Sequence, residues 1–168
     1  LKDVLIIETI VQFVEVTFYI YIAYAMNNIK EYNIASRRYF DWIITTQIML
    51  LSTIMFMEYE SSKKTNQTTT TNKIIMDNKT QLIKIGIYNF AMLAFGYLGE
   101  LNILNKYFSI PIGFIFFGLS FYEIWNNFAF KTEKTRKLYY FLISIWSLYG
   151  VAAVMTIIPK IIIYNCLD

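Results

Sequence analysis

Four side chains in one apolar segment combine residue types that handle charge and protons. Asp41, Thr45 and Ser52 are separated by four and then seven residues, which places them on one face of a helix. Arg38 precedes Asp41 by about one turn on the same face. A carboxylate removed from water needs a positive partner or several hydrogen-bond donors to stay charged. The pattern therefore predicts either a structural ion pair between Arg38 and Asp41 or a functional carboxylate that faces another cation.

The composition indicates that this segment lies in a membrane. Hydrophobic residues make up 57% of the 168 residues and charged residues 16%, whereas charged residues average about 25% in soluble domains. Five apolar segments each approach the ~20 residues that a helix needs to cross a bilayer core. They span residues 4–26, 39–57, 82–101, 108–128 and 138–158, and a stub follows at 161–168. We therefore expect residues 1–168 to form one all-α, multi-pass transmembrane domain in a lipid bilayer.

Other classes of site are excluded by residue counts. The chain has one cysteine, Cys166, and no histidine, so neither an internal disulfide nor a cysteine–histidine metal motif is expected. The net charge is only +3, and the basic residues lie mainly between the apolar segments. No nucleic-acid surface is therefore expected.

The connecting segments predict an orientation. Residues 58–80 are rich in Thr, Asn and Lys and predict a flexible loop without a core. This connection and the one at 129–137 together carry eight basic residues, whereas the connections on the other side carry four. The positive-inside rule places 58–80 in the cytoplasm, with Arg38 and Asp41 toward the outer half of their helix.

A second polar stripe lies on the first apolar segment. Glu8, Gln12, Glu15 and Tyr19 follow spacings of four, three and four residues, so they share one helical face. Two carboxyl groups on such a face could line a path for cations. They could equally form hydrogen-bonded contacts with a further helix that is expected outside this chain, and the sequence leaves both interpretations open.

Several of these segments resemble the microbial rhodopsins. The run 38–46 resembles helix C of that family, whose pattern is Arg-Tyr-x-Asp-Trp followed by Thr. Trp146 and Tyr149 resemble its helix F, Met92 and Gly96 are similar to helix D of proteorhodopsins, and 164–168 resembles the start of helix G. The Asp-Thr-Ser triad of the second segment and the overall composition look closest to rhodopsins of giant viruses. Gln47 and Gly150 stand where the family usually has prolines.

The resemblance implies a seven-helix rhodopsin bundle, of which the chain shows helices B to F and the start of G. It implies all-trans-retinal, bound as a Schiff base to a lysine expected four residues after Asp168, outside this chain. Helix A is also expected outside it. The implied retinal pocket consists of Trp42, Thr46, Met92, Gly96, Trp146 and Tyr149.

The resemblance also implies roles for the charged residues. Asp41 would be the counterion and proton acceptor, and Asp168 the second counterion. Arg38 would organise the outer half of the site, and Thr45 would fix the geometry of Asp41. Tyr19 and Tyr149 are candidate phenolic donors to this complex.

These roles predict an ion transporter rather than an enzyme, most simply an outward proton pump. Ser52 occupies the position at which the family's pumps usually carry a carboxylic acid donor, and serine cannot donate a proton at neutral pH. The alternative is a light-gated cation channel that uses Glu8 and Glu15. A sensory photoreceptor and a transporter without a chromophore remain further alternatives. The expected substrates are protons or small cations, and homo-oligomerisation is left open.

Overall fold

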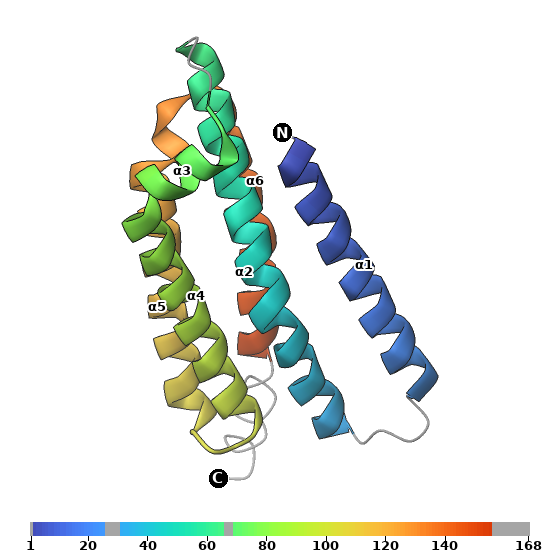
Figure 1. Cartoon of the computed structure of the whole chain (residues 1–168). Coiled ribbons are helices and arrows are strands. Elements are labelled where there is room, and N and C mark those ends of the chain that lie inside the picture. The colour runs from blue at the N-terminus through green and yellow to red at the C-terminus, as the bar shows by residue number, and fades with distance from the viewer. Residues whose placement is uncertain (1, 26–30, 66–68, 156–168) are drawn as a thin grey trace.

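The structure is a computed structural model that describes residues 2–25, 31–65 and 69–155, and in this part of the chain all regular structure is helical (Figure 1). In the described residues, two short helices lie among the long ones. In chain order they are α1 (Lys2–Ala25), α2 (Glu31–Lys64), α3 (Thr71–Asp77), α4 (Lys79–Glu100), α5 (Lys106–Asn127), η1 (Ala129–Lys131) and α6 (Glu133–Met155). The expected stub at 161–168, with Cys166 and Asp168, lies outside the described residues.

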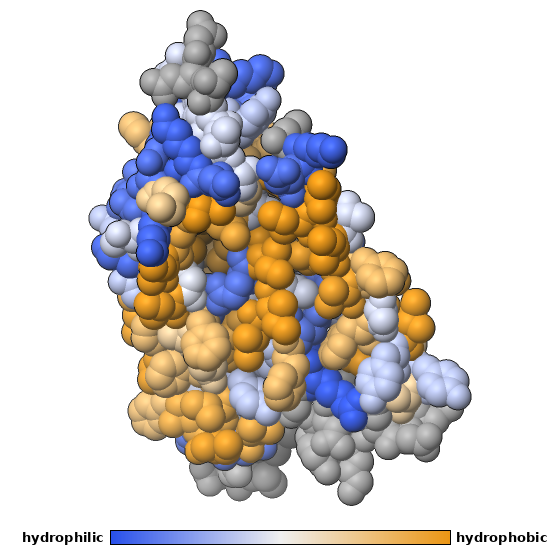
Figure 2. Space-filling view, in the orientation of Figure 1, coloured by the Kyte–Doolittle hydropathy of each residue, from blue (hydrophilic) through white to orange (hydrophobic). Residues whose placement is uncertain are grey.

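Within the described residues, five helices are long and apolar enough to cross a membrane, as the sequence predicts. They are α1, α2, α4, α5 and α6. Helix α1 packs along α2, α2 packs on α4, and α4 packs on α5, while α6 contacts α5 and α2 (Figure 1). On the face shown in Figure 2, apolar side chains form a broad band across the molecule, and hydrophilic ones gather around α3. This arrangement matches a bundle whose middle lies in lipid.

The expected loop at 58–80 needs correction, because much of it is helical. Helix α2 continues to Lys64, and α3 occupies 71–77. The ion pair of Glu58 with Lys131 holds the end of α2 to η1, and Ile74 is buried against other helices. These contacts supply the stabilisation that the local sequence lacks.

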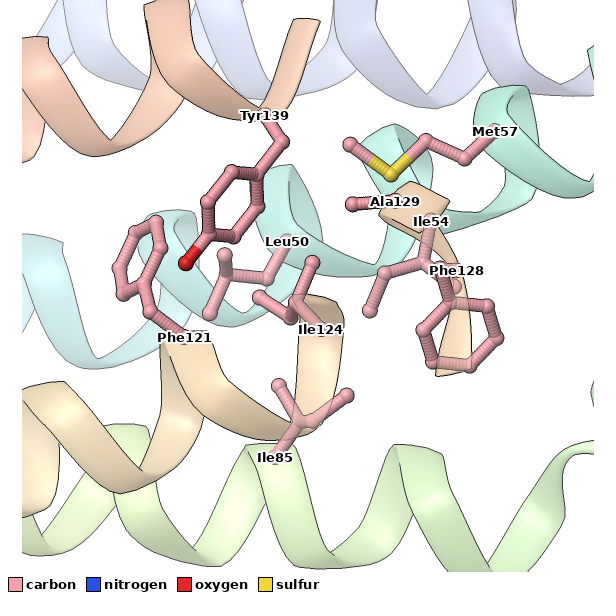
Figure 3. Close-up of a cluster of buried hydrophobic side chains, with 9 residues drawn as sticks. All are labelled: Leu50, Ile54, Met57, Ile85, Phe121, Ile124, Phe128, Ala129 and Tyr139. Carbon is pink, nitrogen blue, oxygen red and sulfur yellow. The ribbon is translucent and has the colours of Figure 1, made fainter. Parts of the chain in front are cut away.

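The largest core cluster holds the helix ends nearest to η1 together (Figure 3). It joins α2, α4, α5, η1 and α6 through nine buried residues: Leu50, Ile54, Met57, Ile85, Phe121, Ile124, Phe128, Ala129 and Tyr139. All of them come from the half of each helix that is nearest to η1. The other halves of the same helices are therefore left to surround a cavity.

Candidate functional site

A cavity of about 310 Å³ lies between the halves of the helices that the core leaves open. Such a volume is at the lower end of the roughly 300–1,000 Å³ of ligand pockets. The six residues predicted to hold the chromophore all line it: Trp42, Thr46, Met92, Gly96, Trp146 and Tyr149. Thr45 and Glu15 line it as well.

Aromatic rings form much of the wall. The ring of Trp42 meets that of Tyr149 edge to face, with 5.6 Å between centroids. Trp146 packs in the same manner on Phe121 of the core, at 5.7 Å. The cavity wall is therefore anchored directly to the cluster that holds the helices together.

Two glycines allow close packing at this wall. A Cβ atom on Gly96 would lie 2.8 Å from the hydroxyl oxygen of Tyr39. A Cβ atom on Gly150 would lie 2.7 Å from ring carbons of Phe114. Gly150, which stands where the family usually has proline, is therefore the residue that lets Phe114 pack against α6.

Asp41 is buried at the edge of this cavity without a hydrogen-bond partner. Its side chain is 6% exposed, and neither carboxylate oxygen has a partner within the described part of the chain. Its neighbours Trp42 and Thr45 both line the cavity. A buried carboxylate in this state is a suitable acceptor for a cationic N–H group.

The residues expected to support Asp41 make no hydrogen bond to its carboxylate within the described part of the chain. The Thr45 hydroxyl donates to the main-chain oxygen of Asp41 at 2.9 Å, and not to its carboxylate. Arg38 is exposed, and no ion pair joins it to Asp41 among the residues that the structure describes. The neighbouring Arg37 instead donates a hydrogen bond to Tyr21 on α1. Asp168, the expected second counterion, lies outside the described residues.

Two polar links join α2 to α4 beside the cavity. Thr46 donates to the main-chain oxygen of Trp42 at 2.6 Å and accepts from the Asn89 amide at 2.9 Å. One residue further, the Gln47 amide donates to the main-chain oxygen of Gly86 at 3.2 Å. Gln47, the second position at which the usual proline is absent, therefore bridges two helices.

The polar stripe of α1 meets α2 at the end of the site nearest to α3. Ser52 donates a hydrogen bond to the carboxyl group of Glu8, and Ser52 is only 1% exposed. Because the helices are antiparallel, this contact and that of Arg37 with Tyr21 place Glu15 near the level of Thr45. Both of these residues line the cavity. Tyr19 is exposed and packs edge to face on Phe18.

The sequence interpretation missed residues both beside the wall and in it. Asn89, which bonds to the lining residue Thr46, is an amide alone in the apolar part of α4, and a polar residue within a membrane span is itself a signal of function. Phe114 and Phe117 both line the cavity and are three residues apart on α5, so their spacing shows a shared face. The sequence alone does not show that this face meets α6.

Comparisons with known proteins agree with this geometry. The chain matches the family of bacteriorhodopsin-like proteins over residues 2–165. Its fold is similar to the crystal structure of the viral rhodopsin OLPVRII, with a TM-score of 0.79 and 30% sequence identity. That match covers 99% of this chain and 75% of the other. None of the curated proteins matches the chain in sequence.

Proposed function

Because the chain belongs to the bacteriorhodopsin-like family, we propose that it is an outward light-driven proton pump. Family membership makes it a microbial rhodopsin: a multi-pass membrane protein with a retinal chromophore that acts as a light-driven transporter or channel. We assign α1, α2, α4, α5 and α6 to helices B to F of that family. The finer proposal concerns the ion, its direction and the residues that move it.

The residues that line the cavity fit retinal. An elongated apolar molecule suits a cavity walled by Trp42, Trp146 and Tyr149. The carboxylate of Asp41, which has no hydrogen-bond partner among the described residues, suits a positive charge at one end. When bound as all-trans-retinal to a lysine at the fourth position after Asp168, the group supplies a protonated Schiff base whose proton becomes transferable after light absorption.

Asp41 is the proton acceptor in this proposal, which rests on the burial of its carboxylate with no hydrogen-bond partner in the part of the chain that the structure describes. A carboxylate so placed gains more by accepting a proton than one already stabilised by hydrogen bonds. Thr45 fixes the main chain of Asp41 through its hydrogen bond, which limits the positions that the carboxylate can take. Arg38 is the residue that would organise the outer half of the site, where the proton leaves, and Asp168, outside the described residues, is the expected second counterion.

Glu8 is the proton donor in this proposal, and Ser52 positions its carboxyl group. The donor acid of the family's pumps usually stands at the position of Ser52 itself. Here the carboxyl group comes from α1 and reaches the same place. The Glu8–Ser52 pair therefore supplies the carboxylic acid that α2 lacks. An internal proton donor of this kind favours a proton pump, because a pump needs an acid to return a proton to the chromophore.

The second candidate is a light-gated cation channel, and the position of Glu15 favours it. Glu15 lines the cavity, and its carboxyl group interacts electrostatically with both Asp41 and Glu8. Three acidic groups along one seam could attract cations as well as relay protons. A sensory role has no such observation in its favour.

Light-induced pH change in cells that express the full-length protein with added all-trans-retinal tests the proposal. Acidification of the medium on illumination, abolished by a protonophore, is expected of an outward proton pump. A coloured protein that gives no pH change but passes a cation current under voltage clamp would contradict the pump and support the channel.

A further inference from the structure

Helix α3 covers the end of the seam between α1 and α2. The side chain of Ile74 is buried with Val4 of α1 and Met55 of α2, and Leu51 packs against the same cluster. The exposed fractions of Val4, Met55 and Ile74 are 8%, 1% and 5%. One side chain of α3 is therefore wedged between both helices.

This wedge lies one helical turn beyond the Glu8–Ser52 hydrogen bond. Val4 precedes Glu8 by four residues, and Met55 follows Ser52 by three. Each pair therefore shares one helix face. Since α1 and α2 are antiparallel, Ile74 closes the seam on the side of α3, one helical turn from the Glu8–Ser52 hydrogen bond.

Helix α3 is held by few contacts, so it can detach locally. It has seven residues, far fewer than a helix needs to persist without tertiary contacts. Beyond the Ile74 wedge, its side-chain tether to α1 is a hydrogen bond from the Thr71 hydroxyl to Asp3, 2.9 Å long and exposed to solvent. Elements held by so few contacts open locally far more often than the whole protein unfolds.

We propose that α3 is a gate on proton entry, in which Ile74 seals the path from the α3-side solvent to Glu8. The gate rests on the proposed donor role of Glu8. With α3 docked, the apolar side chains of Ile74, Val4 and Met55 exclude the water that would carry a proton to the carboxyl group. Glu8 regains its proton when α3 lifts, so the frequency of this opening limits the rate of proton uptake.

Proton uptake after a flash, followed with a pH-indicator dye in the purified full-length protein with bound retinal, measures the gate. Ile74→Ala reduces the wedge and is expected to speed uptake by about tenfold, since it removes several buried carbons. Met76→Ala is the matched control, because Met76 is on the same helix but 73% exposed. It is expected to leave the rate unchanged.

A reversible cross-link provides the opposite test. The double variant Asp3→Cys/Thr71→Cys, made with Cys166→Ser, replaces the hydrogen bond of the tether by a disulfide that holds α3 shut. Oxidation is expected to slow proton uptake by tenfold or more, and reduction to restore it. An unchanged rate in the oxidised protein overturns the gate, whatever Ile74→Ala does.

Glu8→Gln separates the two proposals. If this variant slows recovery of the dark absorption band after a flash while the cross-link leaves proton uptake unchanged, the donor role stands and the gate is wrong. If Glu8→Gln leaves that recovery unchanged, the donor role is wrong, whether or not the cross-link slows proton uptake.

Discussion

The hydroxyl group of Ser52 on α2 donates a hydrogen bond to the carboxyl group of Glu8 on α1. Serine cannot release a proton at neutral pH, whereas a carboxylic acid can. The bond therefore brings an acid to the position on α2 that has none. It also fixes the height of α1 against α2, and with it the level at which Glu15 meets the cavity.

Replacing Glu8 by glutamine retains an acceptor for Ser52 but removes the transferable proton. We expect recovery of the dark absorption band after a flash to slow by about 10²-fold or more, which is the contribution of a positioned general acid. Thr9→Ala is the control, because Thr9 is exposed and its hydroxyl bonds only to its own helix, at Leu5. Equal recovery in Glu8→Gln and the unaltered protein would show that the proton comes from elsewhere.

Replacing Asp41 by asparagine removes the negative charge beside the cavity. The positively charged chromophore then loses its counterion in the dark state, so we expect the absorption band to move to the red and net transport to stop. The control is Glu123→Gln, because the Glu123 carboxylate is 3.8 Å from the Lys84 amine and does not line the cavity. An unmoved band in Asp41→Asn would refute the assignment of Asp41 as counterion.

Much of the bundle and of the cavity wall could be predicted from the sequence. Apolar length alone identifies five spans, because a bilayer requires it. The spacing of Asp41, Trp42, Thr45 and Thr46 places two neighbouring stripes on one helix, and the structure turns Trp42, Thr45 and Thr46 toward the same cavity. These features depend on periodicity within one helix, which a single sequence contains.

Features that depend on two helices could not be predicted in this way. Glu8 and Ser52 meet only because α1 and α2 pack at one particular height, and no local pattern specifies that height. The same holds for α3, a seven-residue helix in which Ile74 is the buried residue. Its helix forms because Ile74 finds Val4 and Met55, so tertiary packing outweighs weak local propensity.

The link between Asn89 and Thr46 should contribute to stability. Asn89→Ala removes a 2.9 Å hydrogen bond at a residue that is 1% exposed, which we expect to cost about 1–3 kcal/mol of unfolding free energy. Thermal loss of the retinal absorption band measures the effect, expected as a drop of roughly 2–12 °C in midpoint. Ser144→Ala is the control, since the exposed Ser144 hydroxyl bonds only to Tyr140 of its own helix. Equal midpoints for the two variants would show that the link does not hold α2 to α4.

Gly150 should be required for the shape of the cavity. In Gly150→Ala the new Cβ atom would lie 2.7 Å from the ring of Phe114, so the ring must move, and Phe114 lines the cavity. We expect a lower ratio of retinal absorbance to protein absorbance in the purified protein, because the displaced ring occupies part of the space for retinal. Gly118→Ala is the matched control, since no atom lies within 4 Å of its added Cβ and alanine favours a helix over glycine by about 1 kcal/mol. If Gly150→Ala binds as much retinal as Gly118→Ala, the ring of Phe114 can give way outward, and the absence of a side chain at position 150 has no bearing on chromophore binding.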